Sequence, residues 1–186
     1  AADHVFITNN GTYTVTIDRV DPTVGSITIG GASGTQTLFL DRATLALNGA
    51  SVINLRGQLQ LSVATSVLAG AGNLTVSGAF IWTRGEMTGA GVTTINSGGV
   101  MTIGGNVDLI GRTLNNSGTI NWNAGAFALD NGAVLNNLAG ATFSVNSDGN
   151  LAMGGAASVI NNAGLFRKTA GITRTDVDPQ FNNTGI

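Results

Sequence analysis

The stretch LNNSGTINW, residues 114–122, decides the fold because it returns three times before the chain ends. Later copies begin at Leu135 (LNNLAGATFSV), Ile160 (INNAGLFRK) and Phe181 (FNNTGI). Every copy holds an apolar residue, two asparagines, a short link and a glycine. The asparagine pairs are 21, 25 and 21 residues apart, beginning at Asn115, Asn136, Asn161 and Asn182. A spacing that recurs in this way indicates a repeat architecture, in which one structural unit is stacked many times.

The same period extends towards the N-terminus. LAGAGNLTVSGAFIW, from Leu68, is echoed 19 residues later by MTGAGVTTINSGGVM, and LNGASVINLRGQLQL, from Leu47, is a more divergent copy. We therefore expect one β-helix domain over residues 1–186. Within it, residues 47–186 form regular repeats, and residues 1–46 form N-terminal capping or irregular coils.

Short runs within each period alternate apolar and polar residues and are rich in threonine, valine and isoleucine, which is typical of strands. Glycine pairs interrupt every candidate helical window. A propeller blade needs about 40 residues, whereas a parallel β-helix builds one coil, with two or three short strands, from about 20 residues. The sequence therefore predicts an all-β, single-stranded parallel β-helix (solenoid) of about 8–9 coils of roughly 20 residues, stacked about 4.8 Å apart.

Coil stacking explains the asparagine pairs. Equivalent residues of successive coils lie above one another, so an inward asparagine at a bend can bond the asparagines of the next coils and satisfy turn backbone groups. The glycine that follows lets the chain bend sharply. Alternation then predicts Ile120 and Trp122 pointing inward with Asn121 outward, and Phe80 and Trp82 pointing inward one repeat earlier.

One position departs from this pattern. Lys168 falls where Trp122 stands in the earlier copy, and an inward lysine is rare. We expect either that the strand ends at Arg167 or that the wall of the helix opens there. The residues that follow, TAGITRTDVDPQ (169–180), do not match the repeat and are expected to form a projecting loop.

The repeated copies, together with GAGNLTVSG (70–78) and GGASGTQTLFLDRATLALNGAS (30–51), resemble the Gly/Asn-rich β-helical repeats of large bacterial secreted and surface proteins. They are similar to filamentous-haemagglutinin-like and autotransporter passenger regions, over nearly the whole chain. The resemblance implies a right-handed helix and an extracellular or cell-surface location, and it carries over no catalytic residue. Because FNNTGI breaks off in mid-repeat, we expect a longer parent chain whose further β-helix coils are partners of this part.

Composition excludes several classes of function. The formal net charge is -2 and charged residues make up 10% of the chain, so we expect no nucleic-acid partner. No run of 18 apolar residues occurs, so we expect no membrane span. Cysteine is absent, which excludes disulfides, thiolate metal sites and cysteine catalysis. With His4 as the single histidine, we expect no metal site and no cofactor.

The mixed-charge cluster near the C-terminus is the candidate ligand-binding loop, formed by Arg167, Lys168, Arg174, Asp176 and Asp178. The same residues would also fit a salt-bridged loop with solvated charges. Two carboxylates are too few for calcium without carbonyl ligands. Asp108 and Asp130, about one coil apart, are either isolated surface acids or a pair that grips carbohydrate. No residue is assigned a catalytic role.

The leading functional hypothesis is a non-catalytic extracellular structural or adhesive module, whose threonine, asparagine and serine faces contact polysaccharide or a host or cell surface. The alternative is part of a polysaccharide-degrading, lyase-like enzyme, which needs a lysine or arginine base near acids. Catalysis is thus left open, although the sequence favours its absence. A third hypothesis is self-association through stacked ends. Ice binding would need threonine at one fixed position of every coil, which does not occur.

Overall fold

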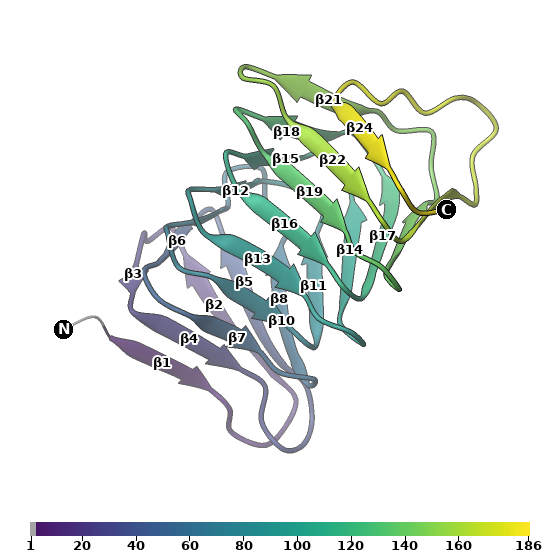
Figure 1. The fold of residues 1–186 in the computed structure, drawn as a ribbon. Helices are drawn as coiled ribbons and strands as arrows, with labels where there is room; N and C mark the ends of the chain where they lie inside the picture. The colour runs from purple at the N-terminus through teal and green to yellow at the C-terminus, as the bar shows by residue number, and fades with distance from the viewer. Residues whose placement is uncertain (1–2) are drawn as a thin grey trace.

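The computed structural model describes residues 3–186, which form one stack of coils (Figure 1). Each full coil gives one strand to each of three sheets, A, B and C, and the described residues contain 24 strands. Neighbouring strands within all three sheets are parallel. The predicted all-β parallel solenoid is confirmed, with about eight turns. Residues 3–186 form no helix with the length and apolar character needed to cross a membrane.

About every third strand along the chain belongs to the same sheet, so neighbouring strands of a sheet are one coil apart. Sheet A contains β1 (His4–Ile7), β4 (Ser26–Ile29), β7 (Ser51–Ile53), β10 (Leu74–Val76), β13 (Val92–Ile95), β16 (Thr113–Asn116), β19 (Val134–Asn137), β22 (Val159–Asn162) and β24 (Gln180–Asn183). Sheet B contains β2 (Tyr13–Asp18), β5 (Gln36–Asp41), β8 (Gly57–Leu61), β11 (Ala79–Trp82), β14 (Val100–Gly104), β17 (Thr119–Ala124), β20 (Thr142–Val145) and β23 (Leu165–Lys168). Sheet C contains β3 (Thr23–Val24), β6 (Thr44–Leu47), β9 (Val67–Ala69), β12 (Glu86–Thr88), β15 (Val107–Ile110), β18 (Phe127–Asp130) and β21 (Leu151–Gly154).

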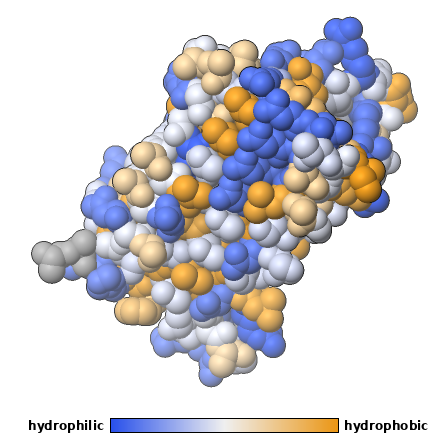
Figure 2. All heavy atoms as spheres, in the orientation of Figure 1, coloured by the Kyte–Doolittle hydropathy of each residue, from blue (hydrophilic) through white to orange (hydrophobic). Residues whose placement is uncertain are grey.

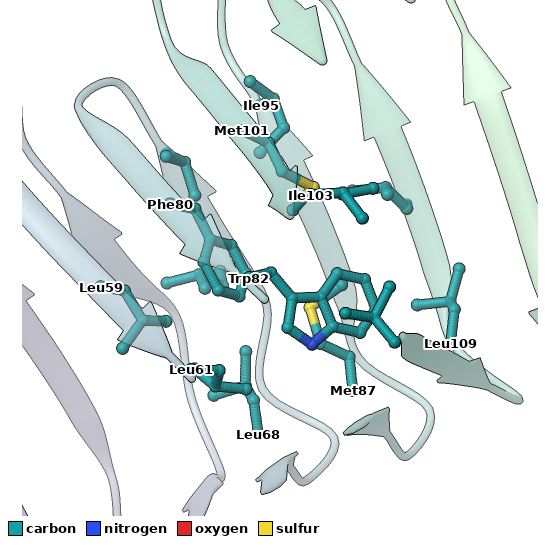
Figure 3. Close-up of a cluster of buried hydrophobic side chains, with 14 of the residues drawn as sticks. Leu59, Leu61, Leu68, Phe80, Trp82, Met87, Ile95, Met101, Ile103 and Leu109 are labelled. Carbon is teal, nitrogen blue, oxygen red and sulfur yellow. The ribbon is translucent and has the colours of Figure 1, made fainter. Parts of the chain in front are cut away.

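Side chains alternate across the sheets as the sequence predicts. Phe80, Trp82, Ile120 and Trp122 are each 0% exposed inside the stack, whereas Asn121 is half-buried on the outside. Figure 3 shows the core around Trp82, where side chains from all three sheets meet. A continuous apolar column along the axis therefore supplies most of the stabilisation, since it removes large aliphatic and aromatic surfaces from water.

Two tryptophans pack against one phenylalanine in the middle of the core. Trp82 and Trp122 lie two coils apart and both meet Phe127 edge to face, with ring centroids separated by 5.7 and 6.5 Å. Each indole Nε1 donates to a carbonyl in its own following turn, Gly85 and Gly125 respectively, at 3.1 Å. The two tryptophans thus fill this part of the core while the one polar atom of each stays bonded.

Between β7 and β22, the corner from sheet A to sheet B alternates in length with a period of two coils. Long corners are closed by a hydrogen bond between their first and fourth residues, at 2.8, 2.8 and 3.0 Å, and span Asn54–Gly57, Asn96–Gly99 and Leu138–Ala141. These corners begin 42 residues apart. In the coils between them the corner has two residues, of which the second is a glycine: Gly78, Gly118 and Gly164.

Glycine is needed at these short corners because the neighbouring coils approach each other closely there. A Cβ on Gly118 would lie 2.3 Å from the Asn96 carbonyl oxygen and 2.4 Å from that of Gly99, in the long corner below. The φ of Gly118 is outside the left-handed region. The expectation that this glycine is needed for a sharp bend was therefore incomplete, because the contact with the coil below excludes any side chain.

Lys168 shows that the wall opens at the last strand of sheet B. Strand β23 continues through Lys168, which pairs with Val145, so the strand does not end at Arg167. Strand β23 is the outermost strand of sheet B as described. The lysine therefore occupies an inward register position but is exposed, because the core above it is not enclosed.

A buried arginine ties three coils together at the corner from sheet C to sheet A. Arg112 is 1% exposed. Its guanidinium donates to the Thr93 hydroxyl (3.0 Å) and to the carbonyl oxygens of Gly70 (3.1 Å), Thr88 (3.0 Å) and Gly72 (3.1 Å). None of the ion pairs within residues 3–186 includes it, and burial lowers its pKa to about 10. Carbonyl dipoles therefore replace the acidic partner that a buried cation usually has.

The first coils, which lie outside the regular sequence repeat, pair in the same three sheets. Strand β1 pairs with β4 and β2 with β5, so parallel stacking begins well before residue 47. Next to the first coil is an open hollow of about 640 Å³ whose apolar lining includes Val5, Val15 and Ile17. Phe6 is 69% exposed beside it. The inward side chains of this coil are thus covered on one side only.

Candidate functional site

The outer face of sheet A bears a ladder of asparagine side chains, the outer ladder, formed by Asn115, Asn136, Asn161 and Asn182. Nδ2 of Asn136, Asn161 and Asn182 donates to Oδ1 of the asparagine one coil nearer the N-terminus, at 2.8, 2.8 and 2.9 Å. Strand pairing places these residues at one register position of neighbouring strands. Figure 2 shows the hydrophilic band on the face of sheet A where this ladder lies.

The second asparagine of each pair forms an inner ladder, made of Asn116, Asn137, Asn162 and Asn183. Here Nδ2 donates towards the C-terminal end, with distances of 2.8, 2.6 and 2.6 Å to the next Oδ1. The first amide also donates to the Thr142 carbonyl oxygen at 3.0 Å and accepts from the Gly118 amide at 3.1 Å. The predicted inward asparagine that bonds its neighbours and the turn backbone is therefore confirmed, and it is the second of each pair.

The outer ladder keeps unused hydrogen-bonding capacity, unlike the inner one. An amide has two N–H donors and an oxygen with two lone pairs. In Asn136 and Asn161 one donor and one lone pair are used between coils. Each of these residues therefore presents one N–H and one lone pair towards the outside, repeated once per coil.

The face that carries the outer ladder is almost free of charge. Across the nine strands of sheet A, all within residues 3–186, His4 is the sole residue among Asp, Glu, Lys, Arg and His. Sheet C, in contrast, carries acids such as Glu86, Asp108 and Asp130. Contact with sheet A therefore requires no desolvation of an ion, which is the costliest step in burying a polar surface.

In the candidate polar loop, the structure joins Lys168 to an acid that the sequence analysis missed. Lys168 Nζ lies 2.7 Å from Asp148 Oδ1 and also donates to the Ser147 carbonyl oxygen at 2.6 Å and the Thr175 hydroxyl at 3.2 Å. The Ile172 amide donates to Asp148 Oδ2 at 2.9 Å. The hydrogen bond from Lys168, followed by that from Ile172, lowers the pKa of Asp148 to about 2. This ion pair ties the loop to the coil below.

The other residues of the candidate loop lie in separate settings. Arg174 Nε is 3.1 Å from Asp176 Oδ1, with the arginine side chain 85% exposed. The Asp178 backbone amide donates to the Leu151 carbonyl oxygen at 2.9 Å. Arg167 is on the outer face of sheet B, where its Nε lies 3.4 Å from the Ser144 hydroxyl. Lys168 and Arg167, adjacent in sequence, thus project from opposite faces of the sheet.

Asp108 and Asp130 project from neighbouring strands on the outer face of sheet C. Asp108 pairs with Glu86 on one side and with Ala128 on the other, and Asp130 is two residues further along its own strand. Partial burial first, and then the charge of Asp130, raise the pKa of Asp108. In the part of the chain that the structure describes, no group of three or more acidic or histidine residues is arranged to hold a metal ion.

Strand alternation alone predicts the outward position of the first asparagine, because Leu114 and Leu135 precede it and point inward. Asp148 has no comparable signal in the sequence, since it lies in a turn that only the folded chain brings to Lys168.

Comparison of the chain with known protein families, curated proteins and solved structures gave no match. Function therefore has to be inferred from the surfaces themselves.

Proposed function

We propose that this chain is a non-catalytic structural and adhesive module of a bacterial secreted or surface protein. The observation that carries the proposal is the almost uncharged face of sheet A with its outer asparagine ladder. Such a face suits many weak polar contacts with glycans on a cell surface. Extracellular use also fits a chain that contains no cysteine.

The solenoid suits the role of a stiff spacer. Its backbone hydrogen bonds run along the axis from coil to coil, so bending or stretching the stack would break several of them together. The inner ladder and the Arg112 guanidinium add further bonds between coils. A module of this kind holds a binding face at a fixed distance from its anchor.

Further β-helix coils of a parent chain are the proposed structural partners. Strands β1, β2 and β3 are paired on one side only, and the hollow beside them is apolar. An unpaired strand edge next to exposed core is a template for another parallel strand. A further coil with apolar inward side chains would pair with these edges and cover Val5 and Val15.

Screening the purified chain on an array of neutral and acidic glycans tests the adhesive role. The proposal expects retention on at least one glycan, with no shortening of the polymer and no new unsaturated sugar ends after long incubation. Cleavage of a uronic-acid polymer that is lost in Lys168→Ala would establish the lyase-like alternative instead. Absence of binding to every glycan would leave only the spacer role.

A further inference from the structure

We propose that the outer ladder of sheet A binds an uncharged, extended polysaccharide that lies along the solenoid axis. This inference rests on the adhesive function proposed above, and it names the face and the chemical class of the ligand. The proposed binding surface consists of Asn115, Asn136 and Asn161 of the outer ladder together with Thr94, which lies in the same column one coil before Asn115.

The hydrogen-bonding pattern of this column fits a polyol. Each amide of the column offers an unused N–H and an unused lone pair to the outside. A hydroxyl group both donates and accepts hydrogen bonds, so it can pair with the unused N–H and with the unused lone pair. Because the pattern recurs once per coil, about every 4.8 Å, only a ligand that repeats its hydroxyls along its length can use several coils together.

A second column beside the ladder supplies apolar contacts. Val92, Thr113, Val134 and Val159 are two residues before the ladder residues on the same strands, so they project from the same face. All four are half-buried, and their methyl groups are partly accessible. Sugar rings present hydroxyl edges and C–H faces, so a ring that spans both columns meets a polar and an apolar strip.

The charge distribution favours a neutral polymer over a uronate polymer. The strands of sheet A offer no lysine or arginine to a carboxylate, while Glu86, Asp108 and Asp130 make the neighbouring sheet C acidic. A polyanion would lose hydration at the ladder and gain no ion pair. The face also lacks tryptophan, tyrosine and arginine in its strands, and these residues dominate protein–protein hot spots.

Affinity should therefore depend on the length of the ligand. Each coil contributes weak contacts, and consecutive coils act on one polymer through effective concentration. A single sugar would be held poorly, and a chain that spans four coils would be retained. This dependence distinguishes a ladder from a pocket, in which one or two sugars supply most of the affinity.

The experiment measures retention of the intact chain on an insoluble neutral β-glucan and on a uronate polymer. Neutral oligosaccharides of increasing length are then used as competitors for the β-glucan. The test variant is Asn136→Ala/Asn161→Ala. Its matched control is Asn146→Ala, because Asn146 Nδ2 makes the same inter-coil bond, 2.8 Å to Asn123 Oδ1, away from sheet A. We expect the test variant to bind about tenfold more weakly and the control to bind as the unmodified chain does.

Several outcomes would overturn the inference. Equal retention of both variants would remove the ladder as the site and leave the adhesive function standing. Binding of the uronate polymer alone would refute the neutral ligand class, and binding of no glycan would refute the adhesive function itself. Concentration-dependent oligomers that the ladder substitutions abolish would assign the face to a second copy of the chain. If the alanine variant unfolds, Asn136→Val/Asn161→Val replaces it, since valine suits a strand and carries no hydrogen-bonding group.

Discussion

Asn116 and Asn137 are joined inside the stack by a hydrogen bond of 2.8 Å from Nδ2 of Asn116 to Oδ1 of Asn137. The outer pair directly beside them, Asn115 and Asn136, is joined in the opposite direction, with Asn136 as the donor, also at 2.8 Å. Adjacent columns of amides therefore run antiparallel. Their dipoles partly cancel, so the two ladders can lie side by side without accumulating a field along the axis.

The two ladders should differ sharply in their contribution to stability. Asn137→Ala removes a 0% exposed amide and leaves its buried partners in two coils unsatisfied, so we expect a loss of about 3 kcal/mol in the free energy of unfolding. Asn136→Ala, on the outside, should cost about 0.5 kcal/mol because water replaces the lost bonds. Urea unfolding of both variants measures the difference, and equal losses would refute the distinct roles of the ladders.

Arg112 should be required for stability despite its unpaired charge. Arg112→Met keeps much of the volume but leaves the carbonyl oxygens of Gly70, Gly72 and Thr88 without their donor. We expect a loss of about 3 kcal/mol, since these oxygens remain buried. Denaturant unfolding checks this value. A methionine variant as stable as the unmodified chain would show that those oxygens find other donors.

Gly118 should tolerate alanine far less well than a glycine that has only a conformational role. Gly118→Ala would place a Cβ 2.3 Å from a carbonyl oxygen of the coil below, at a cost of about 3 kcal/mol. Gly98 has a φ of 86° but open space around it, so Gly98→Ala should cost about 1 kcal/mol. Thermal unfolding of the pair tests this order, and the reverse order would contradict the close approach of the coils.

The ion pair of the C-terminal loop predicts a specific response to pH. The pKa of Asp148 is lowered to about 2 in the folded chain, below its ordinary value of 3.8. Its contribution to stability is therefore fully present above about pH 4 and is lost as the pH falls through about 2. NMR titration of the Asp148 carboxyl carbon should give a low midpoint that rises towards 3.8 in Lys168→Met. An unchanged midpoint in that variant would mean that Lys168 does not hold the carboxylate.

The sequence period was sufficient to predict the solenoid and its core, because stacking forces equivalent residues into columns. Trp82 and Trp122 were assigned to the interior by alternation alone. The two-coil period of the corners was hidden, since the turns that begin at Asn54, Asn96 and Leu138 have the same backbone hydrogen bond but not the same sequence. It becomes visible only through the hydrogen bonds that close each long corner.

Arg112 and Asp148 show where sequence reasoning fails for physical reasons. An isolated arginine in a strand-rich chain normally indicates a surface position. Gly91 leaves room for the Arg112 side chain, because a Cβ there would lie 2.8 Å from its guanidinium. Asp148 acts through Lys168, which is 20 residues away and meets it only because one coil separates them. The ligand-binding candidates of the loop were identified by charge, and charge alone does not indicate which side chains meet.

The central claim is the coil-by-coil alignment of the outer ladder. Disulfide formation between introduced cysteines tests it most directly, because the chain has no cysteine of its own. Asn115→Cys/Asn136→Cys places two thiols on neighbouring coils, about 4.8 Å apart along the stack, within reach of a disulfide. Asn115→Cys/Asn161→Cys places them two coils apart, beyond that reach. We predict rapid intramolecular oxidation of the first pair and none of the second. Equal oxidation of both pairs, or of neither, would contradict the stacked ladder.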